Sequence, residues 1–369
     1  MKIACLADLH ITEKGTIGNK LFTLQGKNLK FLSLERCLNF AVERLIKEKP
    51  DIIFITEAFD RFNPTPNEIA LFIETVIKLR ENGSFIIVEP GNHGVDKNRL
   101  TASPYIFLKG QSNILYTDTP FHIPYSDVDI FILPYPIKYV KSEFFESLNK
   151  FKNIAKENKI KGKKSILLGH FSVDVDFEDE VVVRSETLKD FDLCLLGHIH
   201  NHQKINNIYY VGSLDRLTFN EENDKKGFLL VNLENDTFNV NFIESPALIL
   251  RTFYTEEVLS FQEQDLIELK KEMEKNGQFS IYRLVGVIKE ETEREKIKYF
   301  IDYLKDFNFV INIHFHVERK IKSIVPKENK ELSEEEIIIN YVQNHNIFKT
   351  INIDELLNYH KKIKSRNLL

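Results

Sequence analysis

The sequence predicts an α/β layered domain followed by a smaller α/β unit, and three observations support this. Short apolar runs alternate with segments of helical periodicity from residue 1 to about residue 200, a run of strand-like segments follows, and the alternation restarts near residue 248. Strands that alternate with helices are typical of sheets covered by helices. We therefore expect a first domain over residues 1–245, a second over residues 246–319, and a linker with C-terminal helices over residues 320–369.

The elements of the first domain follow from apolar runs and from the residues that interrupt them. Lys49-Pro50 ends a helix over residues 29–47, because the residue before a proline disfavours helical backbone. Asn82-Gly83 ends a second helix, since these residue types are common just after helix ends. The other expected elements are strands at residues 1–7, 51–56, 84–88, 130–133, 165–168, 193–196, 204–211, 227–233 and 236–244, helices at residues 67–81 and 141–157, and a loop-rich segment at residues 95–125.

The second domain is expected to have the order βαβαβ. Its strands begin near residue 248 and span residues 279–288 and 309–316, and its helices span residues 262–274 and 290–306. A charged linker with Pro326 precedes two short amphipathic segments, at residues 333–342 and 354–363. Ser333 followed by Glu336 fits a capping box, which predicts that a helix begins there.

Composition limits the class of protein and its location. The chain has 369 residues, 43% of them hydrophobic and 28% charged, with a formal net charge of -5, so any contact with DNA needs a local basic patch. Three cysteines lie far apart, two of them in apolar strand-like runs, which argues against a disulfide framework and a cysteine-based zinc site. The sequence contains no run approaching the ~20 apolar residues of a membrane helix, and Asp8 interrupts the first apolar run too early for a signal peptide. We expect a cytoplasmic protein with no membrane partner.

Several strand-like runs end in side chains that bind metal ions or handle phosphate. His198 and His200 follow one such run, and alternate residues of an extended segment point to the same side. The other residues of this kind are Asp8, His10, Glu57, Asn92, His93 and His170. Loops at the carboxyl ends of strands in an α/β sheet face one crevice, so these side chains are expected to converge. The alternative is a crevice lined by histidines without metal. We favour it less, because five separate segments end in side chains of this kind.

The residue types indicate which ions would bind. Imidazoles combined with carboxylates and an amide suit Mn²⁺, Fe²⁺ or Zn²⁺ better than Mg²⁺ or Ca²⁺, which prefer oxygen ligands alone. If one carboxylate bridges, the set is large enough for two ions roughly 4 Å apart, the spacing that clamps both oxygens in phosphoester hydrolysis.

Four motifs among these strand ends resemble those of a known family. Asp8-Leu9-His10, Gly91-Asn92-His93, Gly169-His170 and Gly197-His198-Ile199-His200 look like the motifs of the calcineurin-like metallophosphoesterases, in order and at typical spacing. Residues 210–221, Tyr-Val-Gly-Ser-Leu-Asp-Arg-Leu-Thr-Phe-Asn-Glu, and then Lys226-Gly227-Phe228, are similar to the segment that marks the SbcD nuclease branch, which includes the nuclease of the eukaryotic MRN complex. The resemblance covers residues 1–245 and implies a β-sandwich flanked by helices; the second domain resembles the branch's capping domain by layout only.

The resemblance also implies roles for the residues at the strand ends. Asp8, His10 and His200 would hold one divalent ion. Asn92, His170 and His198 would hold the other, with Glu57 as the bridging carboxylate. His93 would protonate the leaving oxygen or stabilise the charge on phosphorus. The cofactors implied are two divalent ions, Mn²⁺ first, with Fe²⁺ or Zn²⁺ as alternatives.

Two positions depart from the family pattern. The second family motif is Gly-Asp-x-x-Asp, whereas residues 56–60 read Thr-Glu-Ala-Phe-Asp, which places Glu57, one methylene longer, at the bridging position. Gly94 replaces an Asp that would orient the imidazole of His93. Either Asp96 substitutes for that Asp, or His93 is held less firmly. We favour an active but modified site over a weakened or metal-selective one.

Three weaker signals concern DNA. Residues 150–164 carry seven lysines against one glutamate, which fits either a track for a DNA backbone or the solvated face of a helix. Arg61 and Arg99 follow two of the expected metal-site loops, so they are candidate phosphate contacts, with ordinary surface arginines as the alternative. Phe59 and Phe62 suit the core better than stacking on a base.

These observations predict a dinuclear-metal DNA nuclease, both exonuclease and endonuclease, that acts in break processing, repair or recombination. The resemblance implies three partners, which are DNA, an SbcC-like coiled-coil ATPase docked on the C-terminal helices, and a second copy of the chain, through residues 100–109 or the first helix. One alternative is a metallophosphoesterase for small or protein substrates. The other is a DNA-end-binding scaffold subunit whose site has weakened.

Overall fold

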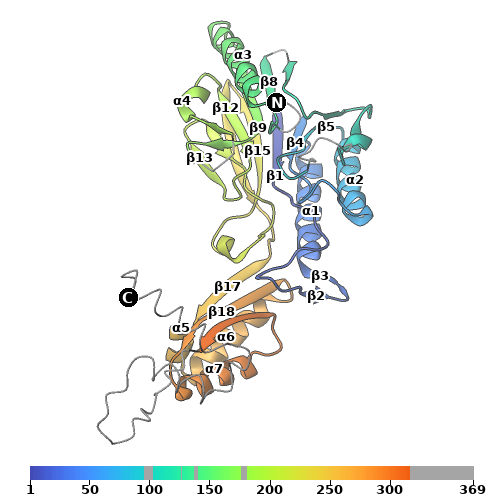
Figure 1. Ribbon diagram of the computed structural model, residues 1–369. Coiled ribbons are helices and arrows are strands. Elements are labelled where there is room, and N and C mark those ends of the chain that lie inside the picture. Colours follow the sequence, from blue (N-terminus) through green and yellow to red (C-terminus); the bar gives the residue numbers. More distant parts are fainter. Residues whose placement is uncertain (95–102, 126, 137–139, 176–180, 316–369) are drawn as a thin grey trace, which may run out of the picture. The chain divides into compact units, whose positions relative to one another are not determined.

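Two large sheets form the body of the protein. The computed structural model describes residues 1–94, 103–125, 127–136, 140–175 and 181–315, and Met1–His316 fall in one compact unit. The sheets have six strands each, in the orders β16-β15-β1-β4-β5-β6 and β13-β14-β12-β9-β8-β7 (Figure 1). The predicted layered α/β class is confirmed. Arg99, Asp96 and the C-terminal segment 320–369 lie outside the described residues, and the domain boundaries stay predictions.

The first sheet combines a parallel half with an antiparallel hairpin. β1, β4, β5 and β6 run parallel, and β15 and β16 are antiparallel to each other. Asn235 and Asp236 join the last two strands with φ of 49° and 62°, the left-handed backbone of the two-residue turns that match strand twist. The bounds are β1 Lys2–Ala7, β4 Ile52–Thr56, β5 Phe85–Glu89, β6 Ile114–Tyr116, β15 Gly227–Glu234 and β16 Thr237–Glu244.

The second sheet has parallel central strands and antiparallel edges, and one of its hairpins corrects an expectation. Residues 204–211 were expected to form one strand but form the hairpin β13–β14, because Asn206 turns the chain with φ of 55°. The segment expected to be loop-rich also contains two short edge strands, β6 of the first sheet and β7 of the second. The bounds are β7 Phe121–Pro124, β8 Val128–Leu133, β9 Lys164–His170, β12 Leu193–Gly197, β13 Gln203–Ile205 and β14 Ile208–Tyr210.

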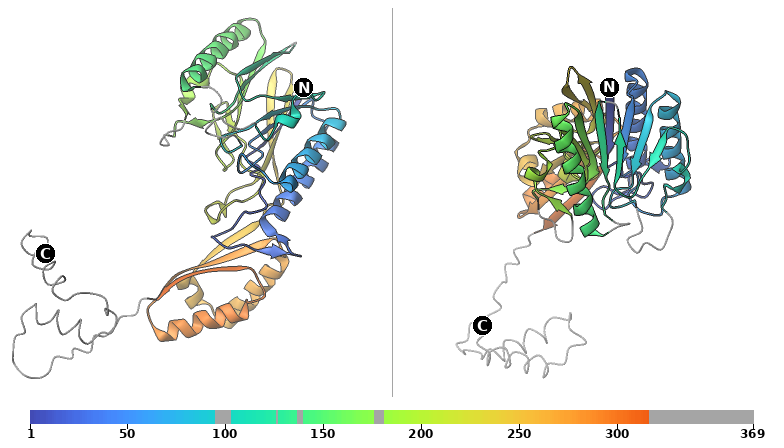
Figure 2. Two further views of the ribbon diagram at one scale, coloured as in Figure 1. Left: turned by 45° about the vertical axis from the view of Figure 1, so that its right-hand side comes forward. Right: turned by 90° about the horizontal axis from the view of Figure 1, so that it is seen from above.

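Helices cover the outer faces of both sheets (Figure 2). α1 (Leu29–Glu48) begins where the Asn28 side chain accepts from two backbone amides, and α2 (Pro66–Glu81) begins at a capping box of Thr65 and Glu68. Both pack on the first sheet, whereas α3 (Lys141–Ile160) and α4 (Ser185–Leu188) pack on the second.

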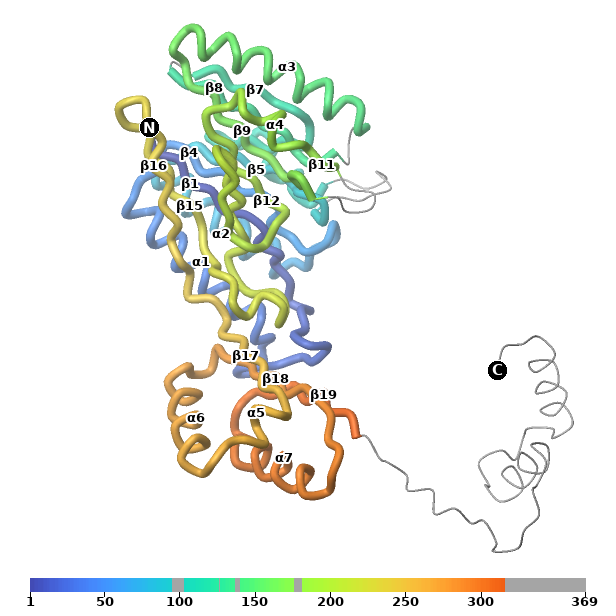
Figure 3. Tube along the Cα trace, turned by 90° about the vertical axis from the view of Figure 1, so that its left-hand side faces the viewer, coloured from blue at the N-terminus to red at the C-terminus, as the bar shows by residue number. Residues whose placement is uncertain are grey.

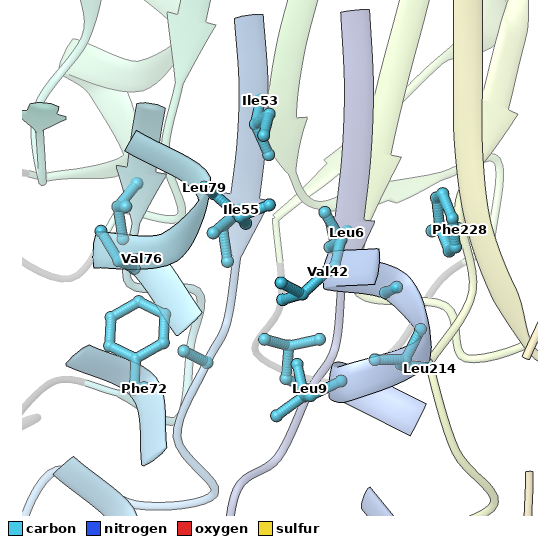
Figure 4. Packing of buried hydrophobic residues seen from close by; sticks show 14 of the residues in the cluster. Leu6, Leu9, Val42, Ile53, Ile55, Phe72, Val76, Leu79, Leu214 and Phe228 are labelled. Atoms are coloured by element: carbon cyan, nitrogen blue, oxygen red, sulfur yellow. The ribbon is translucent and has the colours of Figure 1, made fainter. Parts of the chain in front are cut away.

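The core has three layers. Leu6 and Ile55 of the first sheet pack against side chains of α1 and α2 such as Val42 and Phe72 (Figure 4). A second cluster joins the inner faces of the two sheets, a third lies under α3, and each is fully removed from water at its centre. The three cysteines are free and buried, as expected for a chain without disulfides.

A third, smaller sheet follows β16 (Figure 3). Its strands β17 (Ile249–Tyr254), β18 (Ser280–Ile288) and β19 (Phe309–Phe315) are parallel, and α6 (Glu263–Asn276) and α7 (Glu291–Tyr303) connect them. The expected βαβαβ order is therefore present, with a further short helix, α5 Thr255–Ser260, that was not predicted. The remaining short elements are β2 Thr23–Leu24, β3 Lys27–Asn28, β10 Ser172–Val173, β11 Val182–Val183, η1 Ile106–Leu108 and η2 Phe219–Glu221. Over the described ranges, no helix combines the length and the apolar character needed to cross a membrane.

Candidate metal centre

The carboxyl ends of five parallel strands meet where the two large sheets face each other. β1, β4 and β5 belong to the first sheet, and β9 and β12 to the second. Each strand carries ligand-type side chains at or just beyond its last residue: Asp8 and His10 after β1, Glu57 after β4, Asn92 and His93 after β5, His170 at the end of β9, and His198 and His200 after β12.

The backbone at these strand ends is strained. Asp8, His10, Glu57 and His198 have φ of 49°, 45°, 52° and 92°, a region that residues other than glycine rarely adopt. Hydrogen bonds between neighbouring loops hold it, including Leu9 N to Glu57 O at 2.9 Å. Strain of this kind is concentrated at functional sites, where the surrounding structure compensates for it.

Asp8, His10 and His200 form the first group of converging ligands, with one ligand atom of each within 4.8 Å of the others. The Nε2 atoms of His10 and His200 lie only 3.1 Å apart. The Asp8 carboxylate is oriented by the backbone N–H of His198, which donates to Oδ1 at 2.9 Å. The three residues are those that the resemblance implies for one ion.

Asp8, Glu57 and His170 form a second group under the same limit. His170 Nε2 lies 2.5 Å from Glu57 Oε2 and 3.0 Å from Asn92 Oδ1, which adds the amide to this group. The two groups share Asp8, whereas the family resemblance implies Glu57 as the shared carboxylate. Glu57 still faces both, because its Oε1 lies 3.7 Å from His10 Nε2.

The last two predicted residues also reach the centre. The rings of His198 and His170 are 5.2 Å apart between centroids. His93 Nε2 lies 3.7 Å from Glu57 Oε1, and its side chain is 51% exposed, so it faces both the ligands and the solvent. Burial lowers the pKa of His93, and the opposing charge of Glu57 does not reverse this.

Charge and hydrogen bonding at the centre suit divalent cations. Glu57 Oε1 is buried and has no hydrogen-bond partner, a costly arrangement that a cation would relieve. Burial alone would raise the pKa of Glu57, but the charges of His170 and His10 hold it below its usual range. Burial alone would lower the pKa of His170, yet Glu57 raises it to about 9. Protons thus compensate the buried acids, and metal ions bind such ligands by displacing protons. The donor set therefore fits the pair of ions.

The Nδ1 atoms of three ligand imidazoles lie beside side-chain oxygens. Asp60 Oδ1 is 3.3 Å from His10 Nδ1, Thr56 Oγ1 is 2.8 Å from His170 Nδ1, and Glu221 Oε1 is 3.1 Å from His200 Nδ1. A carboxylate beside Nδ1, as at His200, favours the tautomer with its proton on Nδ1 and leaves Nε2 free for a metal.

Sequence reasoning did not assign a role to two of the acids near the centre. Glu221 is the last residue of segment 210–221, which resembles the SbcD branch, and this position was the only indication of a role in the sequence. Burial alone would raise its pKa, but the hydrogen bond to His200 and the charge of Lys226 lower it to about 2. Glu89, the last residue of β5, is buried 3.6 Å from His170 Nδ1, and burial raises its pKa to about 7. The sequence signal for Glu89 was the position of an acidic residue at the end of an apolar strand.

Most of the residues considered as weaker candidates for DNA contact interact with other residues of this chain. Arg61 Nη2 lies 2.7 Å from the buried carboxylate of Glu68, so the arginine has a structural role whether or not it also contacts phosphate. Phe59 is fully buried, as the core interpretation predicted, whereas Phe62 is exposed. Several lysines of residues 150–164 face acids: Lys156 with Asp190, Lys161 with Glu157, Lys163 with Asp129 and Lys164 with Asp192.

Comparison with known proteins gives a family and several relatives. The sequence model of the family described as calcineurin-like phosphoesterase matches residues 1–202. The SbcD subunit of the nuclease SbcCD from Staphylococcus epidermidis is 28% identical over 316 residues, 78% of this chain and 79% of that protein. "DNA double-strand break repair protein Mre11" of Methanococcus maripaludis is 29% identical over 230 residues, 58% of this chain and 60% of that protein. A solved dimetal phosphatase from Danio rerio aligns with 66% of this chain and 97% of its own, at 12% identity and a TM-score of 0.44.

Proposed function

The chain belongs to the calcineurin-like phosphoesterase family, and from that premise we propose that it is a dinuclear-metal DNA nuclease that hydrolyses phosphodiester bonds. The observation that carries the proposal is the convergence of Asp8, His10, Glu57, His170 and His200 at one point between the sheets. The relatives named as part of a nuclease and as a DNA break-repair protein support DNA as the substrate.

In this proposal, bound divalent ions supply Lewis-acid activation of the phosphoryl group and of water. The protein holds the two ligand groups on rigid strand ends and excludes water behind them, where Asp8 and His170 are fully buried. His93 stands at the open side of the centre. Its imidazole is half exposed and lies 3.7 Å from Glu57 Oε1, which suits a group that protonates the leaving oxygen.

A manganese-dependent hydrolysis assay tests the proposal. The intact chain is incubated with linear duplex DNA and, separately, with a small aromatic phosphodiester. His93→Ala is expected to lower hydrolysis of both by about 10²- to 10⁴-fold, the usual contribution of a general acid. His314→Ala, which removes an exposed imidazole from β19, is the matched control and is expected to leave hydrolysis unchanged.

The two alternative functions predict other results. Cleavage of the small ester without cleavage of DNA would favour a phosphoesterase for small or protein substrates. DNA binding without hydrolysis of either compound would favour a scaffold role. Equal activity of the His93→Ala and His314→Ala variants would contradict the role of His93.

The proposal includes an SbcC-like coiled-coil ATPase as partner, a cytoplasmic location and a homodimer. The two amphipathic segments, residues 333–342 and 354–363, are the proposed docking elements. Two charged substitutions in the first segment, Ile338→Asp with Tyr341→Asp, are expected to abolish co-purification with such an ATPase. Hydrolysis of the small ester by the same variant should be unchanged, and retained co-purification would contradict this assignment.

A further inference from the structure

Glu221 lies behind His200, on the side away from the converging ligands. It is 9% exposed and belongs to the turn of η2. Its Oε1 is 3.1 Å from His200 Nδ1, while its Oε2 accepts the backbone N–H of Leu217 at 2.9 Å. The ring of His200 therefore lies between a buried carboxylate on its Nδ1 side and His10 on its Nε2 side. No ligand motif of the sequence includes this acid.

Lys226 fixes the Glu221 carboxylate from a second direction. The lysine side chain is fully buried, and its Nζ lies 2.9 Å from Glu221 Oε2. The same ammonium group donates to the backbone carbonyl of His200 at 2.9 Å. A buried charge is tolerated only when it is paired and hydrogen-bonded. One lysine thus constrains both the histidine backbone and the acid that contacts its ring.

Arg216 anchors the turn that carries Glu221. Its guanidinium group donates to the carbonyl oxygens of Glu221 at 3.1 Å, Asp224 at 2.8 Å and Leu248 at 2.9 Å. The last contact reaches the residue just before β17, so the turn is attached to the start of the small sheet. This anchoring leaves the Glu221 carboxylate little freedom to move away from His200.

From these contacts we propose that Glu221 is a positioning residue for the metal centre. It selects the tautomer of His200 that carries the proton on Nδ1, and it holds the ring so that Nε2 faces Asp8 and His10. Lys226 keeps the Glu221 carboxylate in place. The inference rests on the proposed metal centre, but the tautomer itself is a property of the metal-free protein and can be measured without any ion.

The first experiment measures Mn²⁺ binding to the full chain by titration calorimetry. Removing an outer partner of a metal-bound histidine typically weakens metal binding 10- to 100-fold. We expect Glu221→Ala to lower the Mn²⁺ affinity of one of two binding events by about that factor and to leave the other unchanged. Glu221→Gln retains an acceptor oxygen for Nδ1, so it should recover part of the affinity.

Glu222→Gln is the matched control. It removes a carboxylate from the same turn, one that accepts the hydroxyl of Thr252 at 2.6 Å instead of facing His200. If Glu221 were only structural, the Glu221 and Glu222 variants would both lose thermal stability without a selective loss of metal affinity. Should Glu221→Ala fail to fold, as judged by circular dichroism, Glu221→Gln with the same two measurements replaces it.

The second experiment records long-range ¹H–¹⁵N correlations of the histidine rings in the metal-free protein. His200 is expected to show the Nδ1-protonated form in the wild type and a mixture of tautomers in Glu221→Ala. A neutral wild-type His200 that carries its proton on Nε2 would overturn the inference. Unchanged spectra and Mn²⁺ affinities in Glu221→Ala would also overturn it. A wild type with the expected tautomer that binds no Mn²⁺ would instead contradict the proposed function.

Discussion

A Cβ atom added to Gly94 would lie 2.8 Å from the hydroxyl oxygen of Tyr105 and 2.6 Å from the carbonyl oxygen of Pro90. The Tyr105 hydroxyl accepts the backbone N–H groups of Ala58 and Phe59 at 3.0 and 3.2 Å. These two residues lie between Glu57 and Asp60, so the tyrosine supports the loop that carries both acids. The Tyr105 side chain therefore lies against Gly94, which replaces the Asp of the family pattern, and also supports the unusual loop at residues 56–60.

Restoring the family residue by Gly94→Asp should harm the protein rather than improve it. The new side chain meets backbone at Pro90 as well as Tyr105, and overpacking of this kind usually costs about 1–3 kcal/mol. We expect a lower free energy of unfolding in urea and no gain in hydrolysis. A stable Gly94→Asp variant with higher activity would show that His93 lacks an orienting partner in the wild type.

Shortening the central acid by Glu57→Asp tests whether the longer side chain is required. In the structure Glu57 Oε2 reaches His170 Nε2 and also accepts the Asn92 N–H at 3.3 Å. Loss of one methylene withdraws the carboxylate by about 1.5 Å, and errors of this size in a catalytic site can cost about 10²-fold in rate. The measurement is kcat for the small phosphodiester at saturating Mn²⁺. Wild-type kcat would show that the site adapts to either acid.

The hydroxyl of Thr56 is expected to orient His170. Its Oγ1 is 2.8 Å from Nδ1, and both side chains are fully buried. Thr56→Val keeps the shape but removes the partner, whereas Thr56→Ser keeps the hydroxyl. We expect about a 10- to 100-fold loss of Mn²⁺ affinity in the valine variant only. Equal affinities in the two variants would assign Thr56 to packing alone.

Arg61 is expected to contribute to stability through Glu68, whose side chain is fully buried. Arg61→Met removes a hydrogen bond to a charged group, worth about 2 kcal/mol, and urea unfolding measures the loss. A phosphate contact would add a second effect, a shallower dependence of DNA binding on salt concentration. An unchanged salt dependence, with Lys47→Met at an exposed position of α1 as the surface control, would leave Arg61 a structural residue.

The ligands could be predicted from sequence because their signals are local. Asp8 and His10, like His198 and His200, stand two residues apart beyond an apolar run, and the sheet brings strand ends together. The supporting residues have no such signal. Tyr105 contacts the amide of Ala58 across 47 residues, and Glu221 contacts His200 across 21, so only the folded chain pairs them. The hairpin at Asn206 did have a local signal that was missed, because two asparagines, a common residue type in turns, interrupt the apolar run there.

Metal removal should lower the stability of the protein, because the centre then holds buried acids that only protons compensate. Glu57 and Glu89 each have one buried carboxylate oxygen with no hydrogen-bond partner. Ions that bind only the folded state stabilise it by mass action, by about 2.7 kcal/mol at a free concentration 100 times the dissociation constant. We expect the thermal midpoint of the chelator-treated protein to rise on addition of Mn²⁺. The rise should be lost in His170→Ala and retained in His314→Ala, and a midpoint indifferent to Mn²⁺ in the wild type would contradict the metal centre.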